Sequence, residues 1–305
     1  MWPSRNDEFR RVKKALQDHS ANVRPLPGIV TQAALETLVK QFIASLRRED
    51  YYARVQQKVI SKERADPRSK AFDAERAVAY YMQQGNVEEA AWLVFLMTHF
   101  ARPADTGWLR LQDVYGKLGE GTWDWITVKA NPAAFANWVY TNAGAIRGKF
   151  GNHRKYESLK SNAKRGLLHV LESYINWIGA AGHKKFFAEV VQQTGNDPAK
   201  IFDALYRSMT VFSFGRLAKF DYLALVGRYR IAPITPGSAY LGGATGPADG
   251  ARLLFTGKSK TPVKLTTLQS WLDDLDADLR VGMSVIEDAL CNWQKSPTTF
   301  IHFKG

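Results

Sequence analysis

Three polar side chains near the C-terminal end of the sequence have the spacing of one face of a helix. Asp288, Asn292 and Lys295 recur at four- and three-residue steps, which places them in line on a helix surface. A carboxylate, an amide and an amine in line could transfer protons or read the edge of a base. An ordinary solvent-facing helix gives the same pattern, so both interpretations stay open. Glu287 lies on a neighbouring face and supplies a second carboxylate.

A basic segment between residues 147 and 165 holds a second group of candidate residues. It contains seven Lys or Arg and one acid, Glu157. Cations beside an aromatic ring suit contacts with phosphate together with stacking on a base or sugar. A solvated basic loop is the alternative interpretation. The residues that combine these properties are consecutive: Asn152, His153, Arg154, Lys155 and Tyr156.

A third candidate is the stretch SMTVFSFGRLAKFDYLALVG at residues 208–227, where a single glycine separates two helical patterns. A glycine there would let a DNA phosphate approach the backbone, opposite the N–H groups that open the second helix. Arg216 and Lys219 would reinforce the contact. A hairpin that merely packs explains the same pattern, since only Gly215 marks the turn.

The overall charge favours a polyanionic partner. Lys and Arg number 42 against 29 Asp and Glu, which gives a net charge of +13. Such an excess raises the local concentration of nucleic acid and speeds encounter with it. An anionic membrane is the second possibility, but no amphipathic anchor is evident. The six scattered histidines and single cysteine match no metal-site spacing, and no phosphate-binding glycine loop is present, so we expect no metal and no cofactor.

The hydrophobic pattern predicts an all-α protein. Apolar residues recur at three- and four-residue steps through most of the chain, and clear alternation is absent. Asn86, Asn131 and Asp197 have the types and positions of helix N-caps. The longest segment predicted to be non-helical covers residues 231–250. We expect two helical lobes, residues 1–150 and 151–305, in a cytoplasmic protein without a secretory signal.

Four motifs together resemble the alpha-glutamyl/putrescinyl thymine pyrophosphorylase family, clade 3. They are NHRKYES, FGRLAKFDYL, PGSAYLGGATGPADGARLLF and EDALCNWQKSP, and the similarity extends from about Pro25 to Gly305. The resemblance implies a divergent helix-hairpin-helix DNA glycosylase fold, with two helical lobes around a cleft. It also implies that a bulky modified nucleotide is flipped out of the duplex into a pocket.

The resemblance transfers roles to particular residues. Gly215 and Arg216 match the hairpin, and a glycine-rich loop expected to face the flipped nucleotide contains Gly246 and Arg252. Asn292 and Trp293 belong to the terminal motif. The implied nucleic-acid-binding residues are Asn152, Arg154, Lys155, Tyr156, Gly215, Arg216, Lys219, Gly246, Arg252, Asn292 and Trp293.

The catalytic residues are harder to transfer, because the aspartate that follows the hairpin in ordinary glycosylases has no counterpart between residues 230 and 245. The candidate carboxylates are Asp221, then Asp288 with Glu287. His153 or Lys295 would assist the departing base.

The resulting expectation is a DNA glycosylase that removes hypermodified bases, such as glucosylated hydroxymethylcytosine, from phage DNA. Abasic sites left in foreign DNA would serve antiviral defence. The partner is double-stranded DNA with modified bases, without a membrane or an obligate protein partner. Two alternatives stay open: a transferase that exchanges a pyrophosphate on modified thymine for an amine, and a non-catalytic reader of modified DNA.

Overall fold

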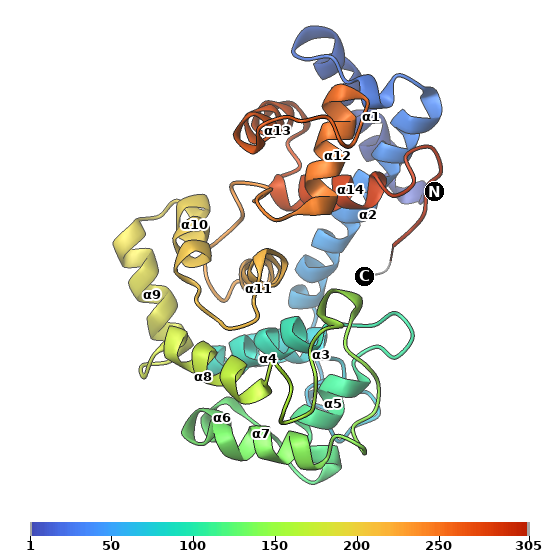
Figure 1. The fold of residues 1–305 in the computed structure, drawn as a ribbon. Helices are drawn as coiled ribbons and strands as arrows, with labels where there is room; N and C mark the ends of the chain where they lie inside the picture. The colour runs from blue at the N-terminus through green and yellow to red at the C-terminus, as the bar shows by residue number, and fades with distance from the viewer. Residues whose placement is uncertain (1, 304–305) are drawn as a thin grey trace. The chain divides into compact units, whose positions relative to one another are not determined.

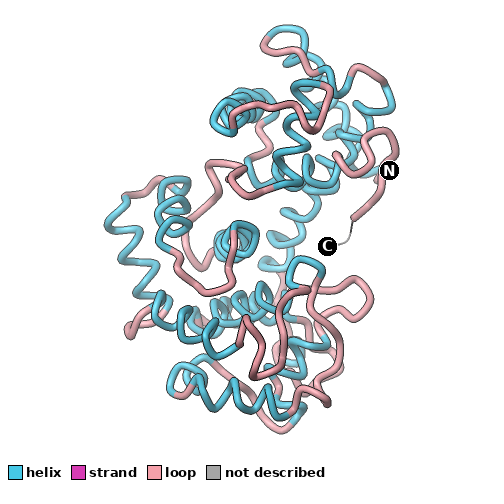
Figure 2. Tube along the Cα trace, in the orientation of Figure 1, coloured by secondary structure: helices cyan, strands magenta, loops and turns pink. Residues whose placement is uncertain are grey.

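The protein is built from helices joined by loops, as the computed structural model shows for residues 2–303 (Figures 1 and 2). No strand occurs within these residues, so the predicted all-α class is confirmed. The chain divides into two compact units. One runs up to Tyr51 and resumes at Pro236, and the other extends from Tyr52 to Thr235. The predicted lobes at residues 1–150 and 151–305 are a different division and stay a prediction.

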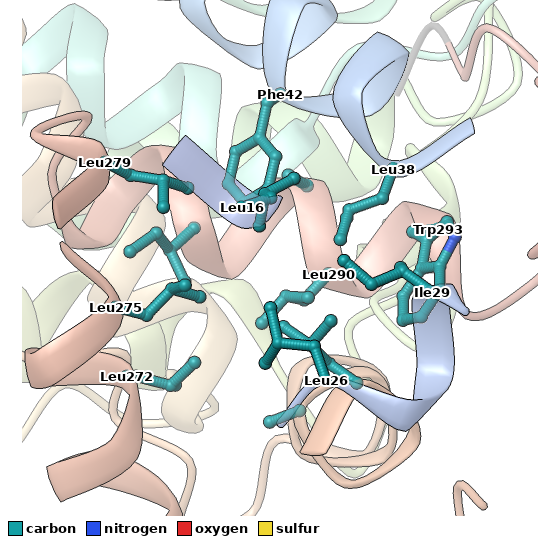
Figure 3. Packing of buried hydrophobic residues seen from close by; sticks show 14 of the residues in the cluster. Leu16, Leu26, Ile29, Leu38, Phe42, Leu272, Leu275, Leu279, Leu290 and Trp293 are labelled. Atoms are coloured by element: carbon teal, nitrogen blue, oxygen red, sulfur yellow. The ribbon is translucent and has the colours of Figure 1, made fainter. Parts of the chain in front are cut away.

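The first unit encloses an aliphatic core (Figure 3). Leu16, Phe42 and Trp293 have no exposed surface there, and burial of each such side chain contributes roughly 1.5–3 kcal/mol. The core therefore joins the start of the chain to its end. The helices of this unit are α1 (Asn6–Asn22), α2 (Gln32–Gln57, which continues into the second unit), α12 (Thr245–Thr256), α13 (Leu265–Leu279) and α14 (Met283–Trp293), with short 3₁₀ turns at Pro3–Arg5 and Pro27–Ile29.

Helices α12 and α14 approach each other closely along two glycines. A Cβ atom added to Gly246 would lie 2.6 Å from the Cys291 sulfur, and one added to Gly250 would lie 2.4 Å from the Leu290 carbonyl oxygen. These glycines are one turn apart on the same face of α12. At Gly250 the neighbouring atoms belong to the backbone of α14, so a residue with a side chain there would force the two helices apart.

The non-helical segment predicted at residues 231–250 is therefore too long. Helix α12 begins at Thr245, so Gly246 lies in a helix, as does Arg252 further along it, and neither belongs to a loop. Pro247 is compatible with this start, because a first-turn residue needs no N–H partner within the helix. The glycines that suggested a loop serve helix packing instead.

The second unit is organised around α4, which is buried from Glu89 to Phe100. Helices α3, α5, α6, α9 and α11 all contact it, which explains why its sequence is apolar on every side. The helices of this unit are α3 (Ala74–Gln83), α4 (Val87–Phe100), α5 (Leu109–Tyr115), α6 (Trp125–Ala130), α7 (Pro132–Thr141), α8 (Leu167–Ile178), α9 (His183–Thr194), α10 (Pro198–Ser208) and α11 (Arg216–Arg228), with 3₁₀ turns at Lys62–Arg64, Lys117–Gly119 and Asn152–Arg154.

A carboxyl group is buried inside this unit at the start of α4. Glu89 accepts hydrogen bonds from the Tyr115 hydroxyl at 2.7 Å and from the Trp125 backbone N–H at 2.9 Å. Burial raises the pKa of Glu89 to about 7, because loss of water disfavours the carboxylate more than the two donors stabilise it. The group thus holds a proton more tightly in the folded chain than in the unfolded one.

Glu89 should make stability depend on pH. Since its folded pKa lies above the ordinary value of 4.5, stability should be highest below that value, fall as the pH rises to about 7, and stay low above it. Glu89→Gln mimics the protonated group, and we expect it to stabilise the protein by about 2–3 kcal/mol at pH 8 but not at pH 4. Denaturant unfolding at several pH values measures this. Exposed Glu189 on α9 provides the control Glu189→Gln, and matching pH profiles for all three proteins would contradict the expectation.

Candidate nucleic-acid-binding and catalytic site

Helices α10 and α11 form a hairpin whose turn ends at Gly215. This glycine is exposed and is the N-cap of α11, with φ −72° and ψ −173°, and no side chain caps the helix. A Cβ atom added there would meet nothing within 4 Å. Neither packing nor an unusual backbone conformation therefore requires a glycine. Because Gly215 has no side chain, an anionic ligand could approach the backbone N–H groups at the start of α11 closely.

Two cations lie beside this turn. The Arg216 guanidinium is 4.7 Å from the centre of the Phe220 ring, and the Lys219 ammonium is 5.7 Å from that of Tyr206. An aromatic face helps to hold a cation in place. Both cations that the sequence predicts for the hairpin thus have an aromatic ring of the hairpin beside them.

Arg154 in the basic segment is buried and braces the hairpin turn. Its guanidinium donates to the Ser213 carbonyl and hydroxyl oxygens, each at 3.1 Å, and to the His99 carbonyl oxygen at 3.3 Å. The Glu157 side chain is only 1 % exposed and lies 3.3 Å from both Arg154 and Arg165. A phosphate contact by Arg154 would require it to leave these partners. We refer to Arg154, Glu157 and Ser213 as the buried ion cluster.

The other candidates in this segment are at the surface. Asn152, His153, Lys155 and Tyr156 are exposed, so their side chains are accessible to a ligand. The Lys155 ammonium is 5.2 Å from the centre of the Tyr156 ring. Arg154 and Lys155 are both cations in the sequence, but the first is buried and the second is exposed.

Asp221 lies half-buried on α11, between the buried side chains of Phe220 and Tyr222. Burial lowers the pKa of Arg154, and the negative charges of Glu157 and Asp221 oppose that shift. Asp221 is therefore within electrostatic reach of the buried ion cluster. The second unit alone brings together the open helix start, the basic segment and this carboxylate.

The first unit holds the other predicted carboxylate. Asp288 accepts hydrogen bonds from Ser45, from Arg48 and, at 2.9 Å, from the Asn292 amide. The Lys295 ammonium donates to the Asn292 amide oxygen at 3.0 Å. The three residues thus lie in line as their spacing predicts. Ser45 and Arg48 come from α2, and the pattern around residue 288 gives no sign of them.

The family model for alpha-glutamyl/putrescinyl thymine pyrophosphorylase clade 3 matches residues 33–305. The chain belongs to this family. No curated protein and no solved structure matches the chain in the corresponding comparisons. The name of the family places the chain among enzymes of thymine modification.

Several of the residues predicted for the site of this pyrophosphorylase-family chain are buried in its interior. Trp293 is fully buried, and its indole N–H donates to the Pro297 carbonyl oxygen at 3.0 Å. Glu287 and Asn292 are also buried. Such residues can influence a ligand only through the position of α14, whereas Asp288 and Lys295 are more accessible.

The sequence interpretation missed Asp249 on α12. This carboxylate is buried, and it pairs with Arg252 at 3.2 Å and with Lys260 at 2.5 Å. The pairing engages Arg252, one of the residues predicted to contact nucleic acid. The three-residue step from Asp249 to Arg252 is the local signal that could have revealed the pair.

The described residues offer neither a metal site nor a helix that could span a membrane. Among residues 2–303, no three His, Cys, Asp or Glu side chains are grouped so as to hold a metal ion. Within the described helices, none is both long and apolar enough to cross a membrane.

Proposed function

We propose that this chain is a DNA N-glycosylase that acts on hypermodified bases of foreign DNA. One observation carries the proposal: a half-buried carboxylate, Asp221, lies on the second helix of a hairpin whose exposed N-cap, Gly215, is followed by the cations Arg216 and Lys219. The hairpin and the basic segment would hold phosphates on either side of a flipped nucleotide. The family supports an enzyme of modified bases.

In this reaction the bond between the sugar C1′ atom and the base nitrogen breaks, and the base leaves with the electron pair. Asp221 would stabilise the positive charge that develops on the sugar and would orient the attacking water. The water oxygen bonds to C1′, and its proton passes to the carboxylate. The exposed His153, on the basic segment of the same unit, would protonate the departing base.

The expected biological role follows from the product. An abasic site damages the DNA that contains it, so the enzyme is useful to a cell only if its substrate is foreign. Hypermodified bases of phage DNA meet that condition. The proposed setting is therefore antiviral defence in the cytoplasm, with double-stranded DNA as the partner.

A transferase is the second candidate, and the family description favours it directly. It would exchange a pyrophosphate on a modified thymine for an amine. The group formed by Asp288, Arg48, Asn292 and Lys295 offers a carboxylate and cations of the kind that such chemistry uses.

Product analysis separates the candidates. The protein is incubated with several phage DNAs that carry different modified bases, and free bases, abasic sites and released pyrophosphate are measured by mass spectrometry and a colorimetric assay. A free modified base with an equal number of abasic sites supports the glycosylase. Released pyrophosphate without abasic sites shows the transferase, and tight binding with neither product shows a non-catalytic reader.

A further inference from the structure

Two aromatic rings stand at the surface of the second unit close to the proposed DNA-binding elements. Tyr156 in the basic segment is 68 % exposed, and Phe212 in the hairpin turn is 41 % exposed. The neighbouring Phe214 is buried, as are most large apolar residues of the chain. Exposed rings at these two positions are not needed for the core.

The buried ion cluster fixes the two segments that carry these rings. Tyr156 directly precedes Glu157, and Phe212 directly precedes Ser213. The Ser213 hydroxyl donates to Glu157 at 3.4 Å and accepts from Arg154 at 3.1 Å. Burial makes these polar contacts costly to break. The backbone positions next to the two exposed rings are therefore fixed by the buried ion cluster.

A second anchor holds Phe212. Its backbone N–H donates to the Ser173 hydroxyl of α8 at 2.8 Å, and its ring lies 5.4 Å from the His169 ring in the first turn of the same helix. The ring is thereby tied to α8 as well as to the turn. A rigid ring loses little conformational entropy when a ligand stacks on it.

Cations lie beside the other ring. The Arg165 guanidinium is 5.7 Å from the centre of the Tyr156 ring. The ring therefore has one cation that precedes it in the sequence, Lys155, and one that follows it, Arg165. Exposed Lys160 and Lys164 add further positive charge to this segment. Rings interspersed with cations match the alternation of bases and phosphates in a nucleic-acid strand.

We propose that Tyr156 and Phe212 are a stacking platform for unpaired nucleotides of DNA. The inference rests on the proposed function, because flipping a base leaves its neighbours unstacked and its partner unpaired. Because only an opened duplex exposes unstacked bases, the platform would distinguish an opened duplex from an intact one. A lipid surface is a poorer fit, since it would favour a continuous apolar patch, whereas each ring here has a polar or charged neighbour.

Binding of unmodified DNA by the full-length chain tests the platform without requiring catalysis. A single strand, an intact duplex and a duplex with one unpaired base are titrated by fluorescence anisotropy at fixed salt. For Tyr156→Ala and Phe212→Ala we expect affinity for the single strand and the interrupted duplex to fall by about 5- to 100-fold each. Affinity for the intact duplex should be unchanged.

Three comparisons make the result specific. Tyr156→Phe keeps the ring and should bind as the unaltered protein does. Ile126→Ala, at a position 78 % exposed on α6, removes an exposed apolar side chain elsewhere in the unit and should have no effect. The salt dependence of binding should be the same in Tyr156→Ala, since the ring carries no charge. Thermal unfolding confirms that each variant is folded.

The outcomes separate this inference from the proposed function. Equal binding of the single strand by the alanine variants and the unaltered protein overturns the platform, even if base release is observed. An equal loss of affinity for the intact duplex overturns it as well. Loss confined to unpaired DNA supports the platform, even if the same protein releases no base and the glycosylase proposal fails.

Discussion

Asp221→Asn is expected to lower the rate of base release by about 100- to 1,000-fold, the usual effect of removing one group that stabilises transition-state charge. The amide has the shape of the carboxylate but no negative charge to offset the cationic sugar. DNA affinity should stay the same or rise slightly, because a charge that repels phosphate is lost. Single-turnover release of a free modified base, measured with excess protein, reports the chemical step.

The choice of control matters because Asp221 also acts on Arg154. Asp203→Asn on α10 removes a carboxylate of the same hairpin that pairs with Arg207 at 2.7 Å on the surface, and it should leave the rate unchanged. Asp288→Asn is the decisive comparison. If its rate falls while Asp221→Asn remains active, the catalytic carboxylate is Asp288 in the first unit.

Local signals in the sequence predict much of the fold. The side chains of Asn86, Asn131 and Asp197 accept hydrogen bonds from the first turns of α4, α7 and α10, as their positions predict. A cap involves residues two or three positions apart, so its pattern is visible in a short window. Glu89, three residues after the cap Asn86, accepts hydrogen bonds from Tyr115 and Trp125 in the interior, and only the fold brings these two partners to it.

Less of the candidate site can be predicted from local sequence signals. The contact of Asp288 with Asn292 could be predicted because both lie on α14 four residues apart, and Lys295 reaches Asn292 from the turn that follows the helix. Arg48, the ionic partner of Asp288, is 240 positions away, and only the fold brings it there. Arg154 is indistinguishable by type from its exposed neighbours, and its burial depends on the hairpin turn that packs against it.

The structural roles of the glycines differ most from those that the sequence predicts. Gly215 was placed at a turn and lies at the start of α11. Gly246 and Gly250 indicated a loop because glycine is common in loops. A glycine at a close contact between helices looks the same in sequence, since only the partner backbone shows why a side chain is excluded.

Gly250→Ala is expected to destabilise the first unit by about 1–3 kcal/mol, as overpacking of a tight core does. The added methyl group would lie 2.4 Å from the carbonyl oxygen of Leu290 and 2.8 Å from its carbonyl carbon. These are backbone atoms of α14, so relief requires the helices to separate. Denaturant unfolding, followed by circular dichroism, measures the loss.

Two matched glycines show that the effect comes from this contact. Gly242→Ala meets nothing within 4 Å and should leave stability nearly unchanged. Gly246→Ala meets the Cys291 sulfur at 2.6 Å, a side-chain atom that can rotate away, so its cost should fall between the other two. Equal stability of all three variants would contradict the close packing of α12 on α14. A graded loss would instead show that the glycines of the GPADG motif set the position of α14, the helix that carries Asp288 and Asn292.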